Sequence, residues 1–338
     1  EADLLMYNLL GPSLTWVEDG IVVPVTAYAE EWGLADNFLD VAIDQWTVND
    51  ELVGFPLEGF NWPVWYNTAI FEEAGVEIPT TTDELITAAA AIRAAGYQPF
   101  AIGGSDWTGS RLFQMFLSGN VAQDDIIALW REGGFADNKQ VRAAVETFVS
   151  LRDAGVFADS AEGMEFNSMN EMFFSGQAAM MHGGSWSYSE LPEEMLDVVV
   201  LGGFPMVPDS PVGAPAWWSG FTAKGIWISR NGAEKLDAIG PFIQYFYQPE
   251  MIARFVEASG LVPPIKGVEV DAELLNPLFV QSLALAESDD AAFVPLAELY
   301  VPGPVFEPMD GPCTDVYVPG MSADDILAAM DETYEYMQ

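Results

Sequence analysis

A large aromatic side chain placed just beyond a strand is the feature of this sequence best suited to bind a ligand. Ala178–Met181 has the length and apolar character of a short buried strand, and the turn Gly183-Gly184 then presents Trp186. In α/β proteins, ligands commonly bind where strands end. Trp is also a common packing residue, so a place in the core is the alternative for Trp186.

A second group of aromatic and amide side chains lies near the start of the chain. Phe60, Trp62 and Trp65 follow one another closely, with Asn61 between them, after an extended segment that ends at Pro56. Flat rings interleaved with amides can line a ligand site, and they can equally be packing residues. We expect Trp65 to lie in the core.

Several other chemistries lack the residues that they need. His182 is the only histidine and Cys313 the only cysteine, so the chain can form neither a Cys/His zinc site nor an internal disulfide. A Ser–His–Asp triad would have to use His182, which follows an apolar strand and is better explained by packing. No phosphate-binding loop or dinucleotide fingerprint is present, and we predict no metal, cofactor or catalytic residue.

The charge of the chain is extreme and narrows its partners. Among 338 residues, 52 are acidic and 11 are Lys or Arg, which gives a formal net charge of −41. Binding to nucleic acid or to anionic membrane surfaces requires basic patches, so both are disfavoured. The acidic residues are scattered among plentiful aromatics, which indicates a folded protein with a solvated acidic shell, and exposure to high salt is one hypothesis for it.

The order of predicted helices and strands indicates the fold class. Helices are predicted from Ser168 and Thr81, whose spacings to Glu171 and Glu84 fit capping boxes, and a last helix is predicted after Ser322 as its cap. Alternating helices and strands favour an α/β fold with largely parallel sheets. The segment Gly303–Gly320, rich in Pro and Gly, is predicted to be irregular. Strands are predicted at Leu4–Tyr7, Pro99–Ile102, Leu196–Leu201 and Gly225–Ser229, besides Ala178–Met181.

Five groups of motifs, in the same order, resemble those of the extracellular solute-binding proteins of ABC importers, family 1. This is the carbohydrate-binding group that includes maltose-binding protein. The matching stretches are Ala2–Tyr7; Gly54-Phe55-Pro56 with Trp65-Tyr66-Asn67 and Pro79–Leu85; Phe173–Met180 with Gly184-Ser185-Trp186; Tyr247–Glu250 with Gly260–Pro263; and Ser322–Tyr334.

The resemblance implies an α/β fold of the two-lobe, periplasmic-binding-protein-like type II, with ligand bound between lobes that close by a hinge. The first lobe would comprise residues 1–58 and 224–290, the second 63–218 and 298–338, with crossings near 59–62, 219–223 and 291–297. The family's opening strand–helix–strand has no counterpart here, so we expect the N-terminal part of the first lobe to be missing.

The positions that match the family's contact regions supply the candidate binding residues. Trp186 is the expected main stacking platform, with His182 packed behind it, and Glu58 and Asp106 are the expected acceptors for hydroxyl groups. The full set of candidates is Tyr7, Glu58, Phe60, Asn61, Trp62, Asp106, Trp107, Trp186, Trp217 and Trp218.

The function implied is capture of a sugar or oligosaccharide, without catalysis, for the membrane permease subunits of an ABC importer. The protein would be a monomer in the periplasm or at the cell surface, either free or lipid-anchored through a segment outside this sequence. Two alternatives remain at this point. The same fold could bind a cationic solute such as a polyamine, using carboxylates and cation–π faces, or the protein could be a carbohydrate-active hydrolase with two carboxylates.

Overall fold

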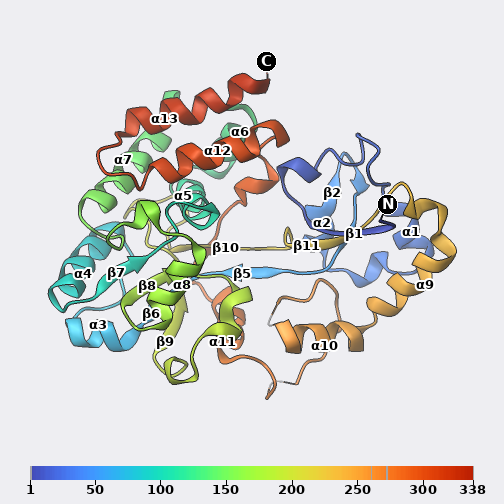
Figure 1. The fold of residues 1–338 in the computed structure, drawn as a ribbon, viewed down its shortest axis with the longest axis horizontal. Coiled ribbons are helices and arrows are strands. Elements are labelled where there is room, and N and C mark those ends of the chain that lie inside the picture. The colour runs from blue at the N-terminus through green and yellow to red at the C-terminus, as the bar shows by residue number, and fades with distance from the viewer. Residues whose placement is uncertain (1, 260, 272, 338) are drawn as a thin grey trace.

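Short strands form small separate sheets that position the other elements of this computed structural model. The structure describes residues 2–259, 261–271 and 273–337, and Figure 1 shows helices packed around sheets at both ends of an elongated molecule. Gly260, the first residue of the matching stretch Gly260–Pro263, lies outside the described residues.

One sheet joins the start of the chain to its middle. Strand β11 (Lys224–Ile228) lies between β1 (Leu4–Asn8) and β4 (Phe55–Pro56), and both pairings are antiparallel. Beside it are the β2–β3 hairpin (Thr47–Val48, Glu51–Leu52) and the helices α1 (Thr26–Glu31), α2 (Asp40–Trp46), α9 (Leu236–Phe246) and α10 (Pro249–Ser259).

A second sheet has the strand order β7-β8-β6-β9, with bounds Gln98–Ala101, Ala178–His182, Val64–Asn67 and Val199–Gly202. Strands β7 and β8 are parallel, whereas β6 runs antiparallel to both of its neighbours. The prediction of largely parallel sheets is therefore wrong. Parallel pairing requires a crossover connection, usually a helix, but β6 and β11 arrive directly from strands outside their sheets, which fixes their direction.

A third sheet contains the segments that the sequence suggested as crossings. Strand β10 (Ala216–Gly220) pairs antiparallel with β5 (Phe60–Trp62), where Trp218 faces Trp62, and parallel with β12 (Ala292–Phe293). Figure 1 shows β5 and β10 running side by side between the two groups of helices. Chain segments far apart in the sequence thus meet through backbone hydrogen bonds in the middle of the molecule.

The remaining helices surround the second sheet and the C-terminal end. They are α3 (Thr68–Ala74), α4 (Thr82–Ala94), α5 (Trp107–Asn120), α6 (Gln123–Glu132), α7 (Lys139–Asp153), α8 (Phe166–Phe174), α11 (Pro277–Ala286), α12 (Gly303–Asp315) and α13 (Ala323–Glu332). The predicted capping box at Thr81 and the predicted cap at Ser322 are confirmed, since each hydroxyl accepts a hydrogen bond from the backbone N–H three residues later.

Two predictions about helices are wrong. Helix α8 begins at Phe166 and not at Ser168. The backbone N–H of Phe166 donates a hydrogen bond of 2.6 Å to the carboxylate of Asp106, so a residue distant in the sequence caps this helix. Helix α12 occupies most of the segment predicted to be irregular. It contains Pro308 and Pro312, but it buries an apolar face that includes Met309 and packs against α5.

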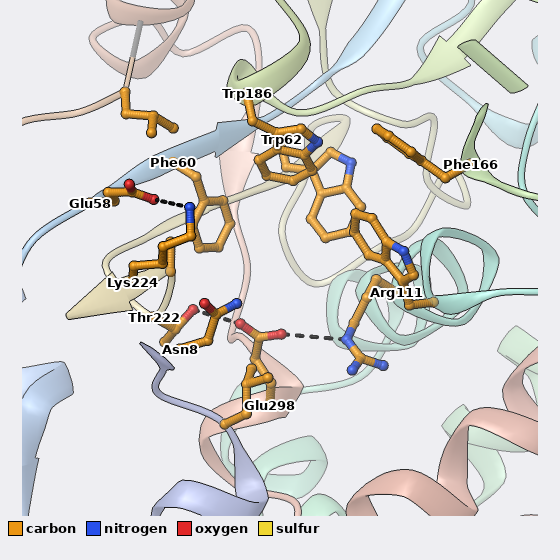
Figure 2. Close-up of a pocket in the computed structure, with 14 residues that line it drawn as sticks. Asn8, Glu58, Phe60, Trp62, Arg111, Phe166, Trp186, Thr222, Lys224 and Glu298 are labelled. Carbon is orange, nitrogen blue, oxygen red and sulfur yellow. Dashed lines mark hydrogen bonds and ion pairs between the residues drawn. The ribbon is translucent and has the colours of Figure 1, made fainter. Parts of the chain in front are cut away.

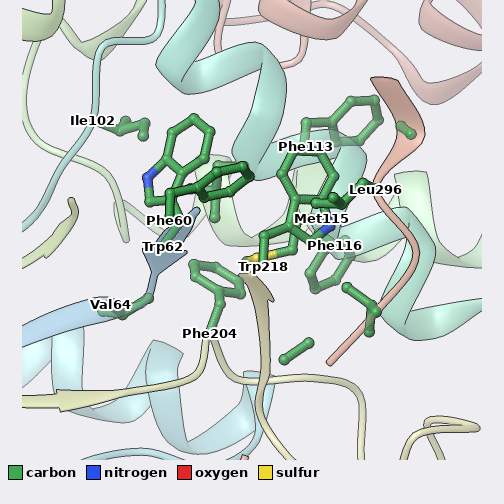
Figure 3. Close-up of a cluster of buried hydrophobic side chains, with 14 of the residues drawn as sticks. Phe60, Trp62, Val64, Ile102, Phe113, Met115, Phe116, Phe204, Trp218 and Leu296 are labelled. Atoms are coloured by element: carbon green, nitrogen blue, oxygen red, sulfur yellow. The ribbon is translucent and has the colours of Figure 1, made fainter. Parts of the chain in front are cut away.

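A buried aromatic cluster joins α5 to the central strands (Figure 3). Phe116 packs edge-to-face on Phe204 at a centroid distance of 5.8 Å, and Trp218 packs edge-to-face on Trp62 at 6.1 Å. Trp65 is fully buried, as predicted. The cluster gives the central strands a rigid support. Over the described residues, no helix combines the length and the apolar character needed to cross a bilayer.

Candidate functional site

A cavity of about 460 Å³ opens between the start of β11 and the N-terminal part of α5. Figure 2 shows aromatic side chains along one side of it and a polar group around Glu298 along the other. It is lined by Asn8, Leu10, Glu58, Phe60, Trp62, Trp107, Arg111, Phe166, Trp186, Thr222, Ala223, Lys224, Leu261 and Glu298.

Three tryptophans form the aromatic side of the cavity. The ring of Trp62 lies 5.0 Å from that of Trp186 and 5.3 Å from that of Trp107, between centroids, and the two outer rings are 5.9 Å apart. Phe60 packs edge-to-face on Trp186 at 6.0 Å. Because the rings are tilted against one another, they form a faceted apolar wall, which is suited to the C–H faces of a sugar ring.

The orientation of these rings is set by their neighbours. The His182 imidazole stacks on Trp62 at 4.7 Å with an interplanar angle of 5°, so it stands behind Trp62 rather than behind Trp186 as predicted. Burial lowers the pKa of His182 to about 3, and the ring is therefore neutral. At Gly184, a Cβ atom would come within 2.2 Å of the Trp186 ring, so only glycine lets this ring fold back over the backbone.

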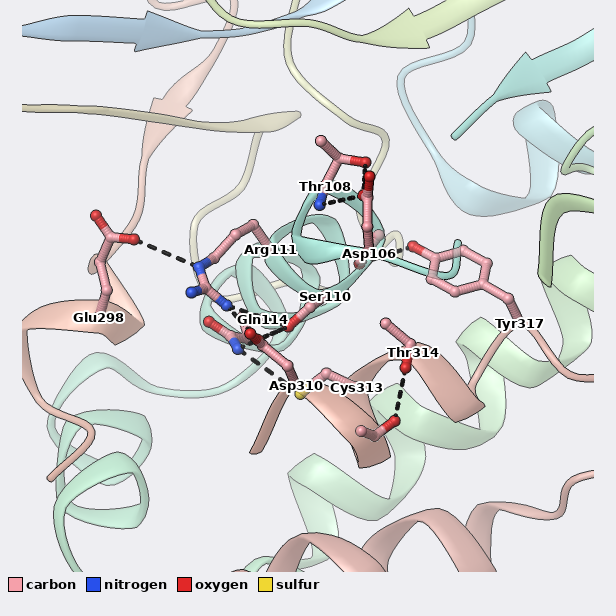
Figure 4. Close-up of polar contacts among 12 residues, drawn as sticks. Asp106, Thr108, Ser110, Arg111, Gln114, Glu298, Asp310, Cys313, Thr314 and Tyr317 are labelled. Carbon is pink, nitrogen blue, oxygen red and sulfur yellow. Dashed lines mark hydrogen bonds and ion pairs between the residues drawn. The ribbon is translucent and has the colours of Figure 1, made fainter. Parts of the chain in front are cut away.

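The polar side is built on the buried carboxylate of Glu298. It accepts a hydrogen bond of 2.6 Å from the hydroxyl of Thr222 and one of 3.4 Å from Nε of Arg111. Nη1 of Arg111 donates in turn to Asp310, 2.6 Å away (Figure 4). Burial alone would lower the pKa of Arg111, but the charges of Asp310 and Glu298 outweigh it and raise the pKa above its ordinary value.

A second carboxylate lines the cavity, and it also has a cationic neighbour. Glu58 is 6 % exposed and lies 3.5 Å from Nζ of Lys224. Burial raises the pKa of Glu58, and the charge of Lys224 opposes this shift only in part. In a chain with 11 basic residues against 52 acidic ones, each carboxylate that lines this cavity is paired with a cation.

Half of the residues predicted to bind ligand meet at this cavity: Glu58, Phe60, Trp62, Trp107 and Trp186 all line it.

The other predicted residues lie elsewhere, for identifiable reasons. Asn61 points away from the cavity because side chains alternate along β5, and its amide hydrogen-bonds to hydroxyl groups of Ser219 and Ser282. Asp106 lies outside the lining, because its carboxylate caps α5 through two hydrogen bonds from Thr108 and accepts a third from the backbone N–H of Phe166 at the start of α8. Trp217 and Trp218 are fully buried and lie outside the lining.

Tyr7 also lies outside the lining, although its neighbour Asn8 belongs to it. The Tyr7 ring is 42 % exposed and packs 5.0 Å from that of Trp16. Because successive side chains of β1 alternate, a prediction placed one residue too early selects the wrong face of the strand.

The polar group around Glu298, opposite the aromatic wall, was not predicted from the sequence. Glu298 is one of many carboxylates in the chain, and its neighbours Arg111 and Thr222 lie far from it in the sequence. One signal was available: Arg111 lies inside a helix that is otherwise buried, and a buried Arg normally has carboxylate partners.

Comparisons with known proteins find matches over most of this chain. Residues 7–253 match the family described as bacterial extracellular solute-binding protein. A multiple sugar-binding protein of Streptococcus mutans is 21 % identical over 284 residues, covering 76 % of this chain and 65 % of that protein. A xylose/arabinose-binding protein of Haloferax volcanii is 28 % identical over 171 residues, covering 47 % of this chain and 36 % of the other.

Solved structures show the same fold. A crystal structure described as a probable secreted solute-binding lipoprotein from Streptomyces coelicolor has a TM-score of 0.86 and 34 % identity. The match covers 99 % of this chain and 84 % of that one. A chitin oligosaccharide binding protein follows with a TM-score of 0.84 and 23 % identity, covering 98 % and 83 %. The predicted two-lobe α/β fold is therefore confirmed.

Proposed function

The chain belongs to the family of bacterial extracellular solute-binding proteins, and we propose that it captures a neutral sugar or short oligosaccharide in the cavity described above. The observation that carries the proposal is the pairing of an aromatic wall with an opposite wall of hydrogen-bonding groups. A pyranose ring has an apolar face and a rim of hydroxyl groups, and the two walls complement these. Relatives named as sugar-binding proteins support this ligand class.

The charge balance of the cavity favours a neutral ligand over a polyamine. A cationic solute needs carboxylates that are not already neutralised, but Glu58 is paired with Lys224 and Glu298 with Arg111. The strong negative charge of the chain therefore belongs to its surface and not to this site. Aromatic faces remain available, and they suit sugar stacking as well as cation–π contacts.

The proposed role is transport without chemistry. The family and the similar structures are named as binding proteins, which supports binding over hydrolysis. We further propose that the protein works as a monomer in the periplasm or at the cell surface, where it delivers its ligand to the permease subunits of an ABC importer. A lipid anchor in a preceding segment is compatible with this role.

We propose that the lobes join at β5, β10 and β12, with one change to the predicted division. Helix α11, expected in the first lobe, hydrogen-bonds to the second: Gln281 donates to the carbonyl of Val199 at 3.3 Å, and Asn276 donates to that of Tyr188 at 2.9 Å. These contacts support a boundary before residue 276 in place of residue 290. Rotation of the lobes about the central strands would open and close the cavity.

Isothermal titration calorimetry with a fixed panel tests the function. The panel contains maltose, raffinose, xylobiose, chitobiose and spermidine, and we expect at least one saccharide to bind while spermidine does not. Binding of spermidine alone would establish the cationic alternative. Mass spectrometry of the bound saccharide after prolonged incubation distinguishes binding from hydrolysis, since shorter products would show an enzyme.

A further inference from the structure

We propose that Glu298 determines ligand specificity by accepting hydrogen bonds from two adjacent hydroxyl groups of one sugar ring, with Arg111 as its positioning residue. The proposal rests on the proposed function, because it names which hydroxyl pattern the cavity selects. Glu298 takes the role of hydroxyl acceptor that the sequence suggested for Asp106, because Glu298 lines the cavity and Asp106 does not.

The carboxylate of Glu298 is fixed and still has capacity to bind. Its two oxygens each accept one hydrogen bond, Oε1 from Thr222 and Oε2 from Arg111. A carboxylate has about four acceptor sites, so each oxygen retains one. Figure 2 shows the carboxylate on the side of the cavity that faces the aromatic wall. Two acceptor oxygens held at a fixed spacing match two neighbouring hydroxyl groups that donate in parallel.

Arg111 holds this carboxylate through a second layer of contacts. Arg111 is only 5 % exposed, and its guanidinium carbon lies 4.9 Å from the centroid of the Phe306 ring. Its Nη1 donates hydrogen bonds to Asp310 and Ser110 (Figure 4). These contacts come from α5 and α12, and together they leave Nε directed at Glu298. A side chain fixed in this way spends little conformational entropy when ligand binds, which favours selective recognition.

The location of Glu298 makes it suited to select among sugars. The ring that stacks on the tryptophans would present its edge to the opposite wall, where Glu298 lies. A buried site built to bind a hydroxyl group strongly rejects an analogue that lacks it, because the site's polar group is then left unpaired. The cavity should therefore select sugars with two adjacent free hydroxyl groups on the ring that lies between the walls.

The first test compares Glu298→Gln with a matched control, Glu51→Gln. Glu51 also accepts a hydrogen bond from a threonine hydroxyl, that of Thr26 at 2.8 Å, but it is exposed and lies outside the cavity lining. Affinity is measured by calorimetry with the tightest-binding saccharide of the panel. We expect Glu298→Gln to weaken binding about 10- to 100-fold, the range for a hydrogen bond to a charged group, and Glu51→Gln to leave it unchanged.

The second test uses monodeoxy analogues of the same saccharide. With the wild-type protein, two analogues that lack adjacent hydroxyl groups should each bind at least about tenfold more weakly. With Glu298→Gln, the affinities of these two analogues should differ much less from the affinity of the parent sugar. A purely structural role for Glu298 would weaken all analogues equally and would overturn the proposal.

The remaining outcomes are also decisive. If Glu298→Gln does not fold, the monodeoxy analogues are measured with Thr222→Val, which removes one of the two hydrogen bonds that hold the Glu298 carboxylate. A smaller discrimination between the parent sugar and the two deoxy analogues than in the wild-type protein supports the proposal. A wild-type protein that binds a saccharide but is indifferent to every deoxygenation overturns the role of Glu298 alone. Failure of every saccharide to bind overturns the proposed function as well.

Discussion

The single histidine allows a clean test of how the aromatic wall is supported. His182 is fully buried behind Trp62, with its ring stacked on the indole, and its pKa is lowered to about 3 by burial. In the unfolded chain the imidazole has its ordinary pKa of about 6.5. Between pH 7 and pH 5 the unfolded chain therefore takes up a proton that the folded protein does not, and lowering the pH favours unfolding.

The size of this effect follows from the two pKa values. At pH 7 about a quarter of the unfolded chains carry the proton on His182, and at pH 5 nearly all do, while the imidazole of the folded protein stays neutral throughout. The free energy of unfolding should then fall by about 2 kcal/mol between pH 7 and pH 5 through His182 alone. The acidic residues add their own pH dependence, so the contribution of His182 must be obtained by difference.

Urea unfolding at pH 7 and pH 5, followed by circular dichroism at constant ionic strength, provides that difference. The comparison is between the wild-type protein and His182→Gln, whose amide does not titrate in this range. Loss of the stacked ring will lower the stability of the variant at both pH values. When the pH is lowered from 7 to 5, the free energy of unfolding should nevertheless fall by about 2 kcal/mol more in the wild-type protein than in the variant.

Equal losses in the two proteins would refute the reasoning. The same would follow if the histidine ring protons of the folded protein, followed by NMR, titrated near pH 6.5. Either result would mean that the imidazole is hydrated or paired in the folded state, so that burial does not keep it neutral and the support of Trp62 is different.

Three further predictions concern binding and stability. Trp186→Ala should weaken sugar binding about 30-fold in calorimetry, since covering about 80 Å² of ring face contributes about 2 kcal/mol to binding. The control is Trp32→Ala, which removes a ring stacked on Tyr28 outside the cavity lining and should lower stability without weakening binding. Because burial raises the pKa of Glu58 above 4.5, the folded protein releases this proton at higher pH than the unfolded chain, and the free energy of unfolding should fall as the pH rises through the raised pKa. Urea unfolding should show a smaller fall for Glu58→Gln, and an equal fall in the two proteins would contradict the prediction. With a net charge of −41, the melting temperature should rise with KCl concentration, and highest stability in low salt would exclude the acidic shell as a salt adaptation.

Local features of the fold could be predicted from the sequence because their causes are local. The hydroxyl groups of Thr81 and Ser322 cap the helices that follow them, and Gly75 ends α3 in the left-handed conformation that glycine adopts freely. The start of α8 could not be predicted in this way, because its cap comes from Asp106, some 60 residues earlier. The prediction of parallel strands was wrong for the same reason, because the direction of a strand depends on where the chain enters its sheet.

The aromatic residues of the site and Glu58 could be predicted from the sequence, but the polar group around Glu298 could not. Tryptophans are few and large, so motifs that place Trp62 and Trp186 at strand ends are informative even without a structure. Carboxylates are so frequent in this chain that neither Glu298 nor its pairing with Arg111 stands out. Asp106 shows the limit most clearly, because an aspartate after a strand can bind a ligand or cap a helix, and only its contacts distinguish the two.

The buried cysteine makes the protein a convenient starting point for an optical sensor. Cys313 is fully buried, and burial together with the charge of Asp310 raises the pKa of its thiol to about 12. Because the thiolate is the reactive form, alkylating dyes should not modify it at neutral pH. A cysteine introduced at the cavity rim would then be the single labelling position in an otherwise native chain, and a fluorophore attached there would report occupancy directly.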